Sequence, residues 1–135
     1  MEQNRASTLI VARPGPLREG VEALMATVPT VEIIGQVEAA SSALRHVSEH
    51  RPDLLLLDAG LPEDESWSVL RYCRMEHAGV RCIVLADDAE QEQAARAAGA
   101  DAVFLKGFPA DKFVRTVERL VSDREEQPRR LRPLS

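Results

Sequence analysis

The chain has few aromatic residues, only two cysteines and no long apolar run. Phe, Trp and Tyr together make up 4% of the 135 residues, so the core must consist mainly of aliphatic side chains. No apolar stretch approaches the roughly 18 residues of a membrane-spanning helix, and residues 1–5 lack the apolar centre of a signal peptide. These absences favour a cytoplasmic protein that has no membrane partner.

The cysteines and histidines show no pattern typical of a metal site or a catalytic group. Cys73 and Cys82 form no Cys-x-x-Cys motif, so we expect two buried free thiols in a reducing compartment. The three histidines share no metal-ligand spacing, and no nucleophile–histidine arrangement is visible around them, so we predict that the protein is not an enzyme. A net charge of −5 argues against general affinity for nucleic acid.

Short apolar segments alternate with segments of helical periodicity. Four consecutive leucines at 54–57 predict a strand that is buried on both faces, as in a parallel sheet. We expect strands at 8–12, 31–37, 54–57, 82–85 and 102–105, and helices that begin near residues 17, 40, 66, 88 and 113. This alternation predicts an α/β protein, a flavodoxin-like (βα)5 doubly wound fold whose five-stranded parallel sheet has the order 2-1-3-4-5.

The expected folded domain covers residues 8–123. Residues 1–7 are predicted to be a disordered amino terminus, and residues 124–135 a flexible basic tail. The tail carries three arginines between two prolines. It could bind an acidic partner or nucleic acid, although the composition favours a solubilising tail.

One edge of the predicted sheet gathers the residues of most interest. Asp58 ends the leucine strand, where a charge is costly unless it is paired, liganded or used in chemistry. Ligands collect at the carboxyl ends of parallel strands, and the expected order makes the first and third strands neighbours. The residues expected to line this edge are Ala12, Arg13, Asp58, Ala86, Asp87 and Lys106.

The motifs of the chain resemble those of response regulator receiver domains, the CheY-like modules of two-component phosphorelay signalling. The matching segments are residues 52–58 (PDLLLLD), Leu61-Pro62, residues 97–101 (AAGAD) and Leu105-Lys106 followed by Pro109. The resemblance extends over about residues 8–122. It implies that Asp58 holds the phosphoacceptor position for a histidine kinase. It also implies that Lys106 contacts the phosphoryl group and supports the switch.

Several positions depart from the receiver pattern. Ala12 and Arg13 stand where the family carries the acidic pair that holds Mg²⁺. Ala86 replaces a hydroxyl residue that bonds the phosphoryl oxygen, and Val103 replaces the aromatic switch residue. Because Mg²⁺ needs hard oxygen ligands, we expect an atypical receiver with a degenerate metal site and no bound cofactor. Phosphoryl transfer without the ion should be slow.

The remaining charges at this edge allow alternative interpretations. Asp87 and Asp88 could return negative charge to the site, although capping of the next helix is favoured. Asp58 could be a working phosphoacceptor or a buried acid that only pairs with a cation. We hypothesise that Arg13 and Lys106 together neutralise Asp58, the alternative being that Arg13 turns to solvent.

These observations favour a stand-alone receiver-like signalling module that acts through protein partners. The expected partners are a histidine kinase or another signalling protein, or a second copy bound through the fourth helix, fifth strand and fifth helix. A phosphorylation-independent scaffold is the main alternative. A flavin-type binder is disfavoured, because Pro14 and Pro16 remove backbone donors that a phosphate cradle needs. A DNA-binding regulator is also disfavoured, because little sequence follows the last predicted helix, and no direct nucleic-acid contact is expected.

Overall fold

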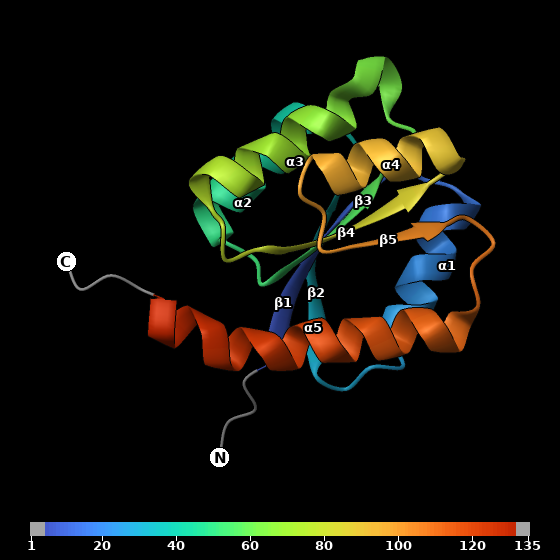
Figure 1. Ribbon diagram of the computed structural model, residues 1–135. Coiled ribbons are helices and arrows are strands. Elements are labelled where there is room, and N and C mark those ends of the chain that lie inside the picture. Colours follow the sequence, from blue (N-terminus) through green and yellow to red (C-terminus); the bar gives the residue numbers. More distant parts are fainter. Residues whose placement is uncertain (1–4, 132–135) are drawn as a thin grey trace.

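The computed structural model describes residues 5–131, with side chains described as far as Asp123. Five parallel strands form one sheet in the order β2-β1-β3-β4-β5, which confirms the predicted fold (Figure 1). The strands are β1 (Ala6–Val11), β2 (Val31–Val37), β3 (Leu54–Asp58), β4 (Arg81–Ala86) and β5 (Ala102–Leu105). The helices are α1 (Pro16–Met25), α2 (Ala40–His50), α3 (Glu65–Glu76), α4 (Ala89–Ala97) and α5 (Ala110–Leu131), with a 3-10 turn, η1, at Pro62–Asp64.

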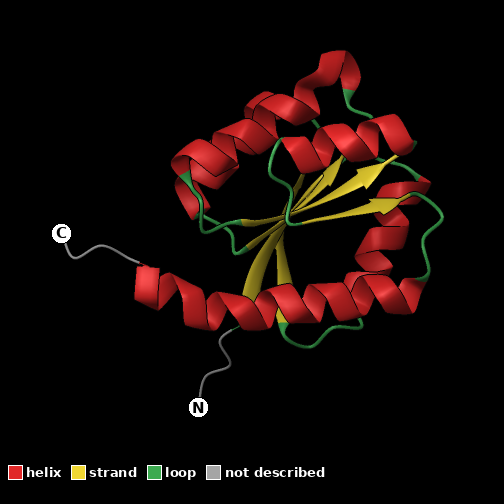
Figure 2. Cartoon of the chain, viewed as in Figure 1, coloured by secondary structure: helices red, strands yellow, loops and turns green. Residues whose placement is uncertain are grey.

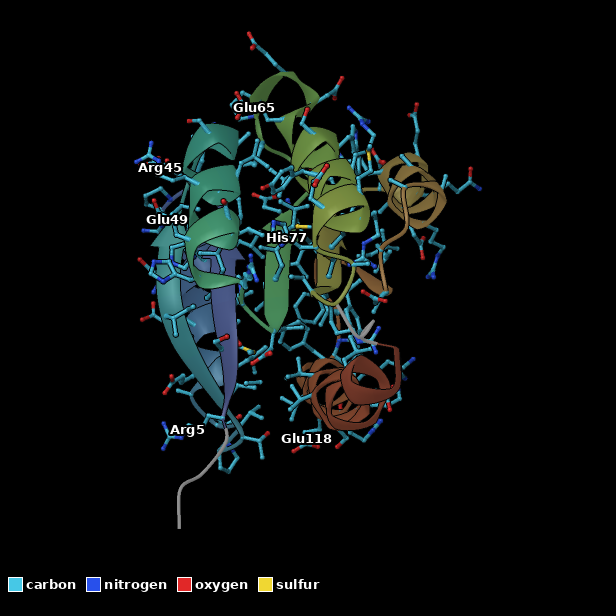
Figure 3. All side chains as sticks on the ribbon, turned by 90° about the vertical axis from the view of Figure 1, so that its left-hand side faces the viewer. Arg5, Arg45, Glu49, Glu65, His77 and Glu118 are labelled. Atoms are coloured by element: carbon cyan, nitrogen blue, oxygen red, sulfur yellow. The ribbon has the colours of Figure 1, made fainter. Side chains whose placement is uncertain are left out.

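The sheet lies between two layers of helices (Figure 2). Helices α2, α3 and α4 pack on one face, and α1 and α5 pack on the other. Charged side chains such as Arg45, Glu49 and Glu118 point outward from the helices (Figure 3). The buried apolar side chains of the helices pack against those of the strands. No helix within residues 5–131 combines the length and apolar character that crossing a membrane requires.

The run of leucines in β3 serves both layers of the core. Successive side chains of a strand point to opposite faces of the sheet. Leu55 and Leu57 accordingly pack with α2, α3 and α4, whereas Leu54 and Leu56 pack with α1 and α5. All four are at most 1% exposed, which explains why no polar residue interrupts the run.

Three local boundaries differ from those predicted. β1 begins at Ala6 rather than at residue 8, because the Ala6 amide bonds to Thr30 and the Ser7 amide to Asp53. Helix α5 continues to Leu131, so the boundary predicted at residue 123 falls inside a helix, and most of the predicted flexible tail is helical. Residues 1–4 and 132–135 of the predicted terminal segments lie outside the described residues. α3 begins at Glu65, one residue before the predicted start.

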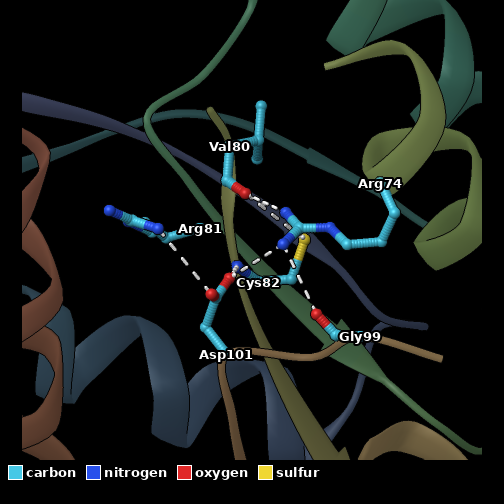
Figure 4. Close-up of polar contacts among 6 residues, drawn as sticks. All are labelled: Arg74, Val80, Arg81, Cys82, Gly99 and Asp101. Carbon is cyan, nitrogen blue, oxygen red and sulfur yellow. Dashed lines mark hydrogen bonds and ion pairs between the residues drawn. The ribbon is translucent and has the colours of Figure 1, made fainter. Parts of the chain in front are cut away.

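A partly buried polar cluster ties α3 to the amino ends of β4 and β5 (Figure 4). The Arg74 guanidinium donates to the carbonyl oxygens of Val80 and Gly99 and lies 3.4 Å from Asp101 Oδ2. Asp101 Oδ2 also accepts a 2.8 Å hydrogen bond from the Cys82 amide. The cluster supplies partners for the Val80 and Gly99 carbonyls and for the Cys82 amide, and it stands at the opposite end of the strands from Asp58.

The two cysteines are buried free thiols, as predicted. Hydrogen bonding with Cys73, together with burial, raises the pKa of the Cys82 thiol well above its ordinary value. Cys82 therefore stays protonated and packs as a small apolar residue.

Replacing Gly99 by Ala should destabilise the fold by about 1–2 kcal/mol. Gly99 has φ +99°, and an added Cβ would lie 2.9 Å from Cδ of Arg74, a side chain held by the cluster just described. Gly107→Ala is the matched control, because its φ of +93° is equally strained but nothing lies within 4 Å of the added atom. Urea unfolding should show the larger loss for Gly99→Ala, and equal losses would exclude a contribution from the Arg74 contact.

Candidate functional site

Three charged side chains meet where β3, β4 and β5 end. Asp58 is the last residue of β3, Asp87 follows β4 and Lys106 follows β5. The Lys106 ammonium lies 2.8 Å from Asp58 Oδ1 and 2.6 Å from Asp87 Oδ1. One cation is therefore shared by two carboxylates, and we refer to Asp58, Asp87 and Lys106 as the ion triad.

The backbone holds the ion triad in place. Strand pairing continues past the strand ends, since the Ala59 amide bonds to Leu85 O and the Lys106 amide bonds to Ala86 O, both at 2.9 Å. Asp58 Oδ1 accepts a second hydrogen bond, 2.8 Å long, from the Gly60 amide. A Cβ on Gly60 would lie 3.2–3.5 Å from oxygens of both carboxylates and from the Lys106 ammonium. Glycine thus allows the loop after β3 to lie directly against the triad.

The ion pair between Asp58 and Lys106 is largely shielded from solvent. The Asp58 side chain is 12% exposed and that of Lys106 28%. Burial alone lowers the pKa of Lys106, but hydrogen bonds to Asp58 and Asp87 outweigh it and raise the pKa above its ordinary 10.5. Lys106 is therefore a permanent positive charge at neutral pH.

The structure separates the roles of the two aspartates after β4. Asp88 is the N-cap of α4, and its Oδ1 accepts a 2.9 Å bond from the Gln91 amide. The Asp87 amide donates to Gln91 Oε1, which leaves the Asp87 carboxylate free to turn toward Lys106. The favoured expectation of capping is correct for Asp88 and wrong for Asp87. The sequence signal was available, because Asp87 is the residue that directly follows a buried strand.

The hypothesised pairing of Arg13 with Asp58 is wrong. Arg13 is exposed, and the described part of the chain shows no ion pair between it and Asp58. An exposed guanidinium keeps its hydration, and Lys106 already compensates the Asp58 charge. Ala12 is buried at the end of β1, where its carbonyl accepts a 3.1 Å bond from Arg18.

The other two predicted site residues are apolar and buried or partly buried. Ala86 ends β4 with no exposed surface and offers only a methyl group toward the core. Val103 in β5 packs against the same core cluster. Neither side chain can form a hydrogen bond with a group bound at Asp58.

The residues of this edge do not fit a magnesium ion. Mg²⁺ requires near-octahedral oxygen ligands. Two carboxylates are present, and both are engaged by the Lys106 ammonium, while the two residues that follow β1 contribute a methyl group and an exposed cation. Within residues 5–131 no group of three or more acidic, histidine or cysteine side chains could hold a metal.

Comparison with known proteins places the chain in a family. The family model described as response regulator receiver domain matches residues 9–118, so the chain belongs to the response regulator receiver domain family. Such domains are signalling modules of two-component systems. Among solved structures, a CheY-like receiver domain from Methanospirillum hungatei covers 91% of this chain and 98% of its own, with a TM-score of 0.78 at 18% identity. That likeness shows the shared fold.

Curated relatives include both short and longer proteins. An uncharacterized transcriptional regulatory protein of Bacillus subtilis, YhcZ, is 30% identical over 102 residues, which cover 74% of this chain and 48% of the relative. The chemotaxis protein CheY of Bacillus subtilis is 26% identical over 67% of this chain and 78% of its own. The transcriptional regulatory protein DegU of Brevibacillus brevis is 25% identical over 51% of its length. The chain therefore spans about half the length of the two regulators.

Proposed function

We propose that this chain is a receiver module that signals through protein–protein contacts and does not use a magnesium-dependent switch at Asp58. The observation that carries the proposal is the sharing of Lys106 between Asp58 and Asp87. The ammonium supplies the positive charge that the buried Asp58 needs. The expectation of a stand-alone module stays a prediction.

The same arrangement makes Asp58 a poor phosphoacceptor. Asp58 Oδ1 already accepts hydrogen bonds from Lys106 and from the Gly60 amide. Phosphoryl transfer needs charge neutralisation around the transferred group, which a metal ion normally provides. Lys106 contributes a single charge, and the Asp87 carboxylate cancels much of its effect.

The partner surface in this proposal is a groove between α4 and α5 that lies over β5, the open edge strand of the sheet. Its volume is about 510 Å³. Leu105 is 43% exposed there, and Lys112 and Arg119 line the groove from α5. Arg96 and Lys106 also line it, but Arg96 is paired with Glu92 and Lys106 with the carboxylates of the ion triad. The two remaining cations and the exposed leucine favour an acidic, partly apolar segment of another signalling protein, such as a histidine kinase.

A homodimer through the groove is the second candidate, because Leu105 is one of only two large apolar side chains exposed in the described part of the chain. Sedimentation equilibrium separates the two possibilities. A monomer at tens of micromolar favours a different protein as partner. A dimer that Leu105→Ser dissociates favours self-association.

Incubation with acetyl phosphate and Mg²⁺ should leave the wild-type protein without a phosphoryl adduct by intact mass. The reason is the absence of a metal site beside Asp58. A conventional receiver domain treated in parallel shows that the donor is active. A stoichiometric adduct that Asp58→Asn abolishes would contradict the proposed function.

A further inference from the structure

Asp87 has no role in the receiver resemblance, yet it makes the shorter of the two ion pairs of Lys106. Its Oδ1 lies 2.6 Å from the ammonium, compared with 2.8 Å for Asp58 Oδ1. An aspartate after a strand commonly caps the next helix or is simply solvated, and neither explanation accounts for Asp87. Asp88 caps α4. The Asp87 carboxylate contacts the Lys106 ammonium, although the Asp87 side chain is 48% exposed.

The contact of Asp87 with Lys106 joins the ends of two strands. Asp87 directly follows β4, and Lys106 directly follows β5, which pairs with β4 at the edge of the described sheet. The backbone bond between the Lys106 amide and Ala86 O already joins these ends, and the side-chain contact adds a charge-assisted bond. Residues 105–109, which lead from β5 into α5, also line the groove.

We propose that Asp87 is a positioning residue, an internal anion that holds Lys106 at the end of β4 and thereby keeps the β5–α5 turn of the groove in one arrangement. The inference rests on the proposed metal-free function, because it assigns the charge balance of the site to the chain itself. An anion built into the sequence is present at all times, so the groove needs no phosphorylation to reach this arrangement.

The test compares amide spectra of the wild type, Asp87→Asn and Asp88→Asn. Asparagine keeps the size of the side chain and removes its charge. We expect Asp87→Asn to shift the amides of residues 105–108, which are Lys106 and its neighbours in the chain, and of Gly60, which lies against the ion triad. Asp88→Asn, the matched control, should shift mainly the first turn of α4 around Gln91.

A second variant excludes a purely local effect of the substitution. In a Lys106→Met background, Asp87→Asn should no longer shift the amides of residues 105–108, because the partner of the carboxylate is gone. Amides of residues 105–108 that do not move in Asp87→Asn would overturn the inference, as would equal movements with and without Lys106. A saturable response of the wild type to millimolar Mg²⁺ would instead overturn the proposed function, so the two failures are distinguishable.

Discussion

Replacing Lys106 with Met should lower the free energy of unfolding by about 2–4 kcal/mol. The substitution removes charge-assisted bonds to two carboxylates and leaves Asp58, whose side chain is 12% exposed, without a cation. The loss is greater than that of an exposed ion pair because a buried charge cannot regain its full hydration. Urea denaturation at neutral pH measures the effect.

Lys112→Met is the matched control for Lys106→Met. Lys112 is exposed on α5, and substitutions of this kind change stability by about 0.5 kcal/mol or less. Adding Asp58→Asn to Lys106→Met should recover most of the lost stability, since the unpaired charge is then removed. A cost for Lys106→Met that equals that of Lys112→Met would show that the ion triad contributes nothing to stability.

The stabilisation by Lys106 should disappear at alkaline pH. Its pKa is higher in the folded protein than the ordinary 10.5, so the stabilisation is fully present below pH 10.5 and is lost as the pH rises through the folded-state pKa. We expect the difference in unfolding free energy between the wild type and Lys106→Met to be constant near neutral pH and to shrink above about pH 10.5. A difference that shrinks already near pH 8 would contradict the raised pKa.

Restoring the acidic pair with Ala12→Asp and Arg13→Asp should create a response to Mg²⁺ and raise the rate of phosphorylation by acetyl phosphate at least about tenfold, which corresponds to about 1.4 kcal/mol of activation free energy. The two carboxylates would enter beside Asp58, because β1 and β3 are paired up to Val11 and Leu57. Intact mass and its time course provide the measurement.

The controls for this variant separate the metal site from the rest of the switch. Asp58→Asn in the restored background should abolish the adduct. If the restored protein binds Mg²⁺ but is not phosphorylated, the next residues to change are Ala86, which lacks a hydroxyl, and Asp87, which engages Lys106. If it gains neither property, the absence of the acidic pair does not account for the behaviour of the site.

Much of the fold could be predicted because its patterns are local. The buried leucines of β3 and the alternation of strands with helices predict the parallel sheet and its order, and the structure has both. Asp58 and Lys106 both stand at strand ends on the same edge of the predicted sheet, so the sequence also predicted that they would lie close together. Both residues stand at the carboxyl edge of the sheet with only β4 between their strands, and the long lysine side chain spans that distance.

The parts that the sequence did not predict depend on competition between side chains. Arg13 and Lys106 are both cations near Asp58 in the predicted sheet, and only the structure shows that Lys106 pairs with it while Arg13 does not. Asp87 and Asp88 are adjacent acids, and their different roles depend on the geometry of the first turn of α4. The extension of α5 beyond residue 123 was missed because the apolar stripe ends before the helix does.

The most direct test of the metal-free site is a Mg²⁺ titration of the wild-type protein followed through the amide signals of Gly60 and Lys106. Gly60 bonds to Asp58 Oδ1, so any ion that takes this oxygen must disturb its amide. The proposed function predicts small, linear shifts without saturation up to about 10 mM, a range in which weak carboxylate sites fill only partly. A saturable shift in the low millimolar range that Asp58→Asn abolishes would contradict it.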